Sequence, residues 1–126
     1  MHEKRVEIRW SDVDGYGHVN NAVYSTYLEE CRDEWLDGAL GDPEGSWDFV
    51  LARVAIDFRR ELRLEDDEVL VRCALARIGT ASVTTTETIL AGGEVAAEAV
   101  LVARNRDRDG SRPLTEAERA ALERAG

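Results

Sequence analysis

Residues 20–38 read NNAVYSTYLEECRDEWLDG, and this stretch decides the fold. Charged residues occupy one side of the segment, as in a helix that covers a protein core. Asn20 and Asn21 stand where a helix N-cap belongs, and Gly38 suits a helix C-terminus. The apolar residues recur at helical spacing and form one stripe: Tyr24, Tyr27, Leu28, Cys31, Trp35 and Leu36. The pattern therefore predicts one long amphipathic helix over these residues.

The rest of the chain has the alternating pattern of β-strands. Val6, Ile8 and Trp10 alternate with charged residues, which is typical of a strand with one buried face. Further strands are predicted over residues 50–62, 69–75, 82–90 and 95–102. The last of these is apolar on both faces, which implies that something covers each side. Residues 41–45 are predicted to be a loop, 104–111 a charged turn and 113–122 a short helix.

This order of elements predicts an α+β fold. The aromatic stripe of the helix needs an apolar cover, and one face of a sheet is the only apolar surface large enough to provide it. We therefore predict a five-stranded antiparallel sheet wrapped around one long central helix. The whole chain, residues 1–126, is expected to form a single domain.

Composition excludes several classes of protein. The chain has 26 acidic and 16 basic residues, for a net charge of −10, and such a surface repels nucleic acid. No apolar run approaches the roughly 20 residues of a membrane helix, and no signal peptide is visible, so we expect a cytoplasmic protein without a membrane partner. Cys31 and Cys73 lack the spacing of a zinc site and are expected in the core. We predict neither a metal nor a cofactor.

Residues 9–24, RWSDVDGYGHVNNAVY, are the segment with the most chemistry. Here a strand leads into a loop with two aspartates, which runs directly into a helix N-terminus. The free N–H groups at such a terminus polarise a carbonyl and stabilise an oxyanion. The carboxylate of Asp14 is seven residues before Asn21 and can reach the same point, where it would serve acyl transfer as nucleophile or base. His18 adds a group that can donate, accept or carry a proton near neutral pH.

Several of these residues also have ordinary structural explanations. Asp12 is expected to cap the loop or pair with Arg9, and the side chains of Asn20 and Asn21 to cap the helix. Tyr24 is expected in the core or in a pocket wall. Two arginine clusters, Arg59, Arg60 and Arg63 and then Arg104, Arg106 and Arg108, are either charged surface or a local positive patch for phosphates.

Residues 9–24, with Glu30 and Arg32, resemble the 4-hydroxybenzoyl-CoA thioesterase-like branch of the hot-dog fold superfamily, and are similar to its short-chain acyl-CoA thioesterases. The later strand order fits as well, so the resemblance covers nearly the whole chain. It implies a hot-dog fold and an edge-to-edge homodimer, often within a homotetramer. It also implies active sites at the dimer interface that hydrolyse acyl-CoA, or sometimes acyl carrier protein, without a metal.

The resemblance also assigns roles. Asp14 matches the catalytic aspartate, and Asn21 matches the position whose backbone N–H polarises the thioester carbonyl. His18 is the third catalytic candidate. The candidate substrate-binding residues are Gly17, Tyr24, Arg59 and Arg60. The implied partners are an acyl-CoA substrate and further copies of the chain.

Three other functions stay open. The first is a carrier-protein thioesterase that releases a fatty or polyketide chain, although the acidic surface is unfavourable because carrier proteins are themselves usually acidic. The second is a non-catalytic acyl-CoA-binding hot-dog protein, although such sensors usually carry an added DNA-binding segment. The third is a hot-dog dehydratase, because one fold supports several chemistries.

Overall fold

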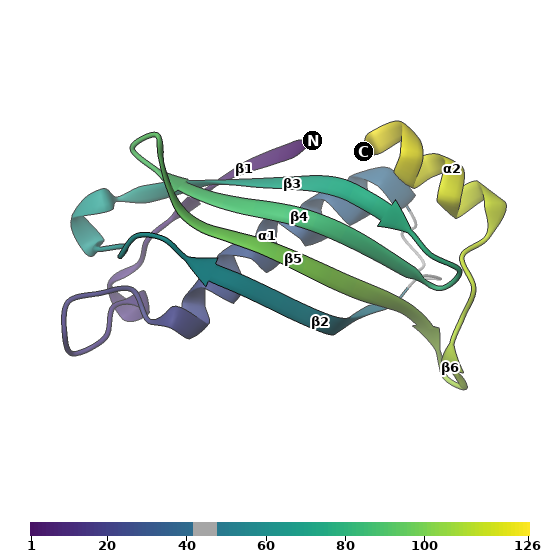
Figure 1. The fold of residues 1–126 in the computed structure, drawn as a ribbon, viewed down its shortest axis with the longest axis horizontal. Coiled ribbons are helices and arrows are strands. Elements are labelled where there is room, and N and C mark those ends of the chain that lie inside the picture. The colour runs from purple at the N-terminus through teal and green to yellow at the C-terminus, as the bar shows by residue number, and fades with distance from the viewer. Residues whose placement is uncertain (42–47) are drawn as a thin grey trace.

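The computed structural model describes residues 1–41 and 48–126. One long helix, α1 (Asn21–Leu40), lies across one face of an antiparallel sheet that curls around it (Figure 1). The strand order is β1-β3-β4-β5-β2. The strands are β1 (His2–Glu7), β2 (Phe49–Phe58), β3 (Glu68–Ile78), β4 (Ser82–Ala91) and β5 (Glu94–Asp107), and the two-residue β6 (Gly110–Ser111) pairs with the end of β5. The predicted fold class is confirmed, with β6 as an addition.

Helix α1 forms because its apolar stripe finds a cover. All six stripe residues are buried, and they pack against β1, β3 and β4. The side chain of Asn20 caps the helix by accepting a hydrogen bond from the N–H of Ala22 at 2.9 Å. The helix continues past Gly38 because Ala39 and Leu40 pack against the core, and it ends at Gly41 in the left-handed conformation.

The end of β5 corrects the predicted turn over residues 104–111. The strand continues to Asp107 because β2 pairs with it along its length, from Phe58 opposite Ala97 to Phe49 opposite Asn105. β2 in turn ends at Phe58, earlier than the predicted 62. Beyond that point the backbone N–H groups of Arg59 and Arg60 both donate to the carbonyl of Ala96.

Burial differs from the prediction at three places. Trp10 is 82 % exposed in the short 3-10 helix η1 (Trp10–Asp12) instead of lying on a buried strand face. No residue of β2 is buried, because α1 packs on the other strands of the sheet. Val100 on the outer face of β5 is 44 % exposed, so the described residues cover only one face of that strand. β2 and β5 therefore present apolar surface to solvent.

The C-terminal helix α2 (Glu116–Ala125) packs against α1 and β3. It starts later than predicted because Thr115 and Glu118 form a capping box there. Cys31 and Cys73 are buried as free thiols, which confirms the core prediction. Most of the predicted loop 41–45 lies outside the described residues. Within the described residues, no helix has the length and apolarity needed to cross a membrane.

Candidate active site

A short closed loop presents Asp14. Val13 and Val19 form an isolated antiparallel bridge, and the N–H of Asp14 donates to the carbonyl of His18 at 2.8 Å. Gly17 allows the loop to close because its φ is +84°, a conformation that a side chain would strain. One carboxylate oxygen of Asp14, Oδ1, accepts from the N–H groups of Tyr16 at 2.9 Å and His18 at 3.2 Å. Among the described residues, Oδ2 has no hydrogen-bond partner, so it is the oxygen available for chemistry.

Asp12, at the end of η1 just before this loop, is held in place by several hydrogen bonds. Its side chain is 4 % exposed and accepts hydrogen bonds from the backbone N–H and side chain of Arg9 and from the Tyr27 hydroxyl at 2.8 Å. Burial alone would raise the pKa of this carboxyl, but these donors hold the pKa of Asp12 below its ordinary value. The pairing with Arg9 confirms the structural role predicted for Asp12.

The helix N-terminus beside this loop has a free donor. The N–H of Ala22 is bonded to the Asn20 side chain and the N–H of Val23 to the Asn20 carbonyl. The N–H of Asn21 has no acceptor among the described residues. Because it lies at the positive end of the 20-residue helix α1, it is suited to hold a polarised carbonyl oxygen.

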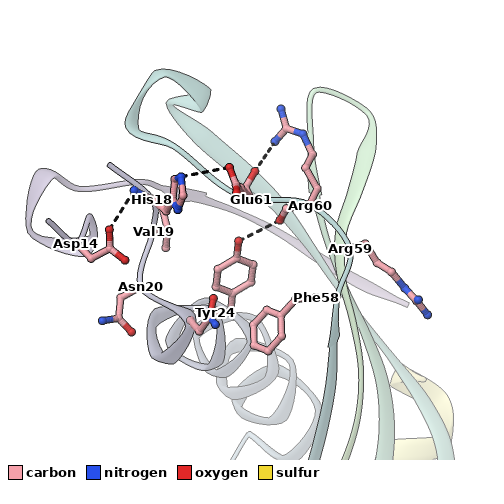
Figure 2. Close-up of a pocket in the computed structure, with 10 residues that line it drawn as sticks. Asp14, His18, Val19, Asn20, Tyr24, Phe58, Arg59, Arg60 and Glu61 are labelled. Carbon is pink, nitrogen blue, oxygen red and sulfur yellow. Dashed lines mark hydrogen bonds and ion pairs between the residues drawn. The ribbon is translucent and has the colours of Figure 1, made fainter. Parts of the chain in front are cut away.

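Asp14 and this helix start line one cavity of about 530 Å³. Its wall consists of Asp14, His18, Val19, Asn20, Asn21, Tyr24, Phe58, Arg59, Arg60 and Glu61. Figure 2 shows Asp14 on one side of the cavity, Phe58 and Arg59 on the other, and Tyr24 between them. The structure thus brings together every site residue predicted from the sequence except Gly17, which lies in the adjacent loop.

Tyr24 and Phe58 form the apolar part of the wall. Their rings meet edge to face with centroids 5.0 Å apart. The Tyr24 hydroxyl donates to the carbonyl of Arg60 at 3.1 Å and accepts from the N–H of Leu62 at 3.0 Å. This fixes the ring, and burial raises the pKa of the Tyr24 hydroxyl, so it stays protonated. Tyr24 is a pocket wall, one of the two roles that the sequence suggested.

The first arginine cluster is not an unpaired positive patch. Arg59 contacts Glu98 at 3.2 Å and Asp57 at 3.8 Å. Arg60 pairs with Asp66 at 3.0 Å and with Glu94 at 3.1 Å. Both guanidinium groups lie beside the cavity, but each already has carboxylate partners. Their charge is therefore partly neutralised before any ligand arrives.

Outside the segment 9–24, two wall residues, Phe58 and Glu61, were not predicted from the sequence as part of the site. Phe58 was predicted only as part of a strand, and Glu61 only as a polar position on it. Glu61 lies beyond the strand end and contacts the His18 ring nitrogen Nε2 at 3.2 Å. No local sequence signal indicates this contact, because the two positions are far apart in the chain.

The arrangement has the parts that acyl transfer needs. A carboxylate oxygen and a helix N–H, both without a partner in the described part of the chain, belong to residues of the same cavity, and an apolar wall lies beside them. A carbonyl carbon held between them would face the carboxylate, while its oxygen would face the N–H. Within the described residues there is no cluster of three or more metal-ligating side chains.

Comparisons with known proteins agree with this description. A family model described as the thioesterase-like superfamily matches residues 8–123. A thioesterase from Thermus thermophilus, solved with coenzyme A and Zn, is 32 % identical, with a TM-score of 0.89 over 98 % of this chain and 92 % of the other. A predicted thioesterase from Bacillus stearothermophilus is 27 % identical, with a TM-score of 0.89 over 98 % of this chain and 94 % of the other.

A curated relative gives a shorter match. The Long-chain acyl-CoA thioesterase FadM of Escherichia coli K12 is 34 % identical over 70 residues, which is 51 % of each chain. The match therefore spans about half the length of that relative. The family model, in contrast, covers nearly the whole of this chain, including the Asp14 loop and α1. The chain belongs to the thioesterase-like superfamily.

Proposed function

We propose that the protein is an acyl-CoA thioesterase, which hydrolyses the thioester to a free acid and coenzyme A. The observation that carries the proposal is that Asp14 and Asn21 line one cavity, where Oδ2 of Asp14 and the N–H of Asn21 have no partner among residues 1–41 and 48–126. The full-length likeness to a thioesterase solved with coenzyme A supports it. In this reaction the Asn21 N–H binds the carbonyl oxygen, and the acyl group lies against Tyr24 and Phe58.

Asp14 then drives the chemistry in one of two ways. As a base, Oδ2 takes a proton from water while the water oxygen adds to the carbonyl carbon. As a nucleophile, Oδ2 adds to that carbon itself and forms a mixed anhydride, which water then hydrolyses. In both cases the C–S bond breaks, and the thiolate of coenzyme A leaves and takes up a proton.

The test is release of free thiol from a panel of aliphatic and aromatic acyl-CoA substrates. We expect turnover of at least part of the panel. The same acyl groups on acyl carrier protein test the second candidate, a carrier-protein thioesterase, which the net charge of −10 disfavours. Ligand binding without turnover of any thioester would instead favour the non-catalytic acyl-CoA-binding protein.

We infer that Arg59 contributes to binding the phosphates of coenzyme A. The side chains of its partners Asp57 and Glu98 are 75 % and 52 % exposed, and such surface ion pairs contribute at most about 1 kcal/mol, so a phosphate can replace them. Arg60 is the second phosphate candidate, but its pairing with the more buried Asp66 makes it harder to displace.

The variant Arg59→Ala is expected to raise the KM for acyl-CoA about threefold to tenfold, which corresponds to one lost charge-assisted contact. Its kcat should be unchanged. An acyl-N-acetylcysteamine thioester, which lacks the phosphates, should show no difference between the variant and the wild type. A higher KM for both substrates would contradict a phosphate contact.

We further propose that the active form is a homodimer joined along β2. β2 is an edge strand, and Val50, Leu51, Val54 and Phe58 on it are each 37–47 % exposed. A twofold axis between two antiparallel β2 strands would bring these apolar residues of the two copies together.

The dimer prediction uses Val54→Asp. Val54 is 42 % exposed in a single protomer, so its replacement should leave the protomer folded. A carboxylate buried at the dimer interface without a partner is strongly unfavourable, and light scattering should therefore show monomers. Val95→Asp, at a 38 % exposed position of β5 beside the turn that joins β4 to β5, is the matched control and should stay dimeric. A dimeric Val54→Asp variant would contradict the β2 interface.

The assembly of two dimers into a tetramer stays a prediction, as does the cytoplasmic location.

A further inference from the structure

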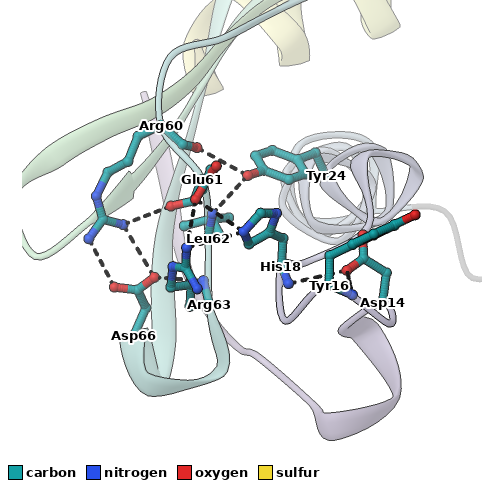
Figure 3. A network of polar contacts seen from close by, with 9 residues as sticks. All are labelled: Asp14, Tyr16, His18, Tyr24, Arg60, Glu61, Leu62, Arg63 and Asp66. Carbon is teal, nitrogen blue, oxygen red and sulfur yellow. Dashed lines mark hydrogen bonds and ion pairs between the residues drawn. The ribbon is translucent and has the colours of Figure 1, made fainter.

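We propose that Glu61 is a positioning residue for the reaction, acting on the Asp14 loop through His18. This inference rests on the proposed function. Glu61 comes from the segment between β2 and β3, whereas His18 comes from the loop before α1. Figure 3 shows the two side chains meeting beside the cavity, together with Arg63.

Three charged or polar groups converge on one point here. Glu61 Oε2 lies 3.2 Å from His18 Nε2 and 3.0 Å from Arg63 Nη2. Arg63 Nη2 in turn lies 3.1 Å from the same His18 Nε2. The carboxylate therefore lies between two nitrogen groups that it can hold in place.

The chemistry of Nε2 decides which contact is a hydrogen bond. If Nε2 carries a hydrogen, both Nε2 and Arg63 Nη2 donate to the same carboxylate oxygen of Glu61, and this shared acceptor offsets the 3.1 Å contact between the two donors. If Nε2 carries a lone pair, it accepts from Arg63, but the lone pair then faces the Glu61 carboxylate at 3.2 Å. Glu61 therefore selects the form of His18 with hydrogen on Nε2. In this form the other ring nitrogen, Nδ1, carries the lone pair, and it has no partner among the described residues.

His18 connects this cluster to Asp14. The backbone N–H of His18 donates to Asp14 Oδ1, and the His18 carbonyl accepts from the N–H of Asp14. The next residue, Val19, donates its N–H to the carbonyl of Leu62 at 2.7 Å. The 61–63 segment thus supports the loop twice, through the backbone at Leu62 and through the side chain of Glu61. Loss of the side-chain support would let the Asp14 carboxylate deviate from its productive direction.

The experiment compares Glu61→Ala with Glu65→Ala. Glu65 lies on the same segment and is exposed, and its side chain has no hydrogen bond or ion pair within the described part of the chain, so its loss controls for charge alone. We expect Glu61→Ala to lower kcat about tenfold to a hundredfold, the range for a small misplacement of a catalytic group. KM and the melting temperature should stay near the wild-type values. Glu61→Gln should recover part of kcat, because its amide oxygen can still accept from Nε2.

A double-mutant cycle tests the route through His18. If Glu61 acts through this residue, His18→Ala with Glu61→Ala should lose no more activity than His18→Ala alone, so the effects are not additive. Additive losses, or wild-type kcat in Glu61→Ala, would overturn the proposal while leaving the thioesterase function intact. A wild-type protein inactive on every thioester would overturn both.

Imidazole ¹H–¹⁵N spectra add a readout independent of activity. In the wild type the hydrogen should be on Nε2 of His18, and in Glu61→Ala a mixture of the two tautomers should appear. An unchanged spectrum would also refute the proposal.

Discussion

The variant Asp14→Asn is expected to lose thiol release by about 10²–10⁴-fold, the range for removal of a positioned acid–base group. Asparagine retains an oxygen that can accept from the N–H groups of Tyr16 and His18, so the loop should keep its shape. The replacement changes the other atom, Oδ2, into an amide nitrogen that can neither take a proton from water nor attack a carbonyl. The measurement is steady-state release of coenzyme A by the wild type and the variant at equal concentration.

Two controls make this result specific. Asp37→Asn changes an exposed aspartate on α1 and should leave turnover unchanged. The melting temperature and oligomeric state of Asp14→Asn should match the wild type, which would exclude loss of fold.

Hydroxylamine added during turnover of the wild type distinguishes the nucleophile from the base. It traps a mixed anhydride on Asp14, whereas it leaves a carboxylate that acts as a base unmodified. Turnover near the wild-type level in Asp14→Asn would remove Asp14 from the mechanism.

The fold was predictable because its determinants are local. The stripe from Tyr24 to Leu36 has helical period, and the strands alternate with period two, so each element can be identified from its own residues. The Asp14 loop was predictable for the same reason, since the turn, the cap and the helix start are adjacent in sequence. Trp10 was misplaced because alternation alone does not show that the chain turns into a 3-10 helix at that residue.

The far side of the cavity was not predictable in the same way. Phe58 lies at the end of β2, and Glu98 and Glu94 reach Arg59 and Arg60 through the pairing of β2 with β5, which no local pattern specifies. A positive patch was one of the two interpretations of the clustered arginines. The structure gives Arg59 and Arg60 carboxylate partners from other segments, Glu98 and Glu94. Charges that are distant in sequence neutralise one another in ways that a charge count does not reveal.

Arg32 shows the same limit in the core. Its position on the helix suggested the charged face, yet its side chain is only 5 % exposed. Arg32 Nη1 donates to both carboxylate oxygens of Glu87 on β4, at 2.9 and 3.2 Å, and the Glu87 side chain is fully buried. The hydroxyl of Thr85 and the thiol of Cys73 also donate to that carboxylate. This buried pair joins α1 to the sheet across the core.

Arg32→Met is therefore expected to lower the free energy of unfolding by about 3–5 kcal/mol, because it leaves a buried carboxylate without its counter-charge. Chemical denaturation at constant pH measures the change. Arg5→Met removes an exposed pair with Glu68 and should cost at most about 1 kcal/mol. The double variant with Arg32→Met and Glu87→Leu should recover much of the loss, since neither charge of this pair is then left in the core.

The loss of unfolding free energy in Arg32→Met should also depend on pH. Burial raises the pKa of the Glu87 carboxyl, while Arg32 favours its charged form. Without Arg32 the folded protein binds a proton at Glu87 more readily than the unfolded chain does, so stability is present at low pH and is lost as pH rises through the raised pKa. The difference in unfolding free energy between the variant and the wild type should thus be smaller at acid pH than at neutral pH. An equal deficit at both would mean that the cost comes from lost packing of the arginine side chain, and not from the isolated charge of Glu87.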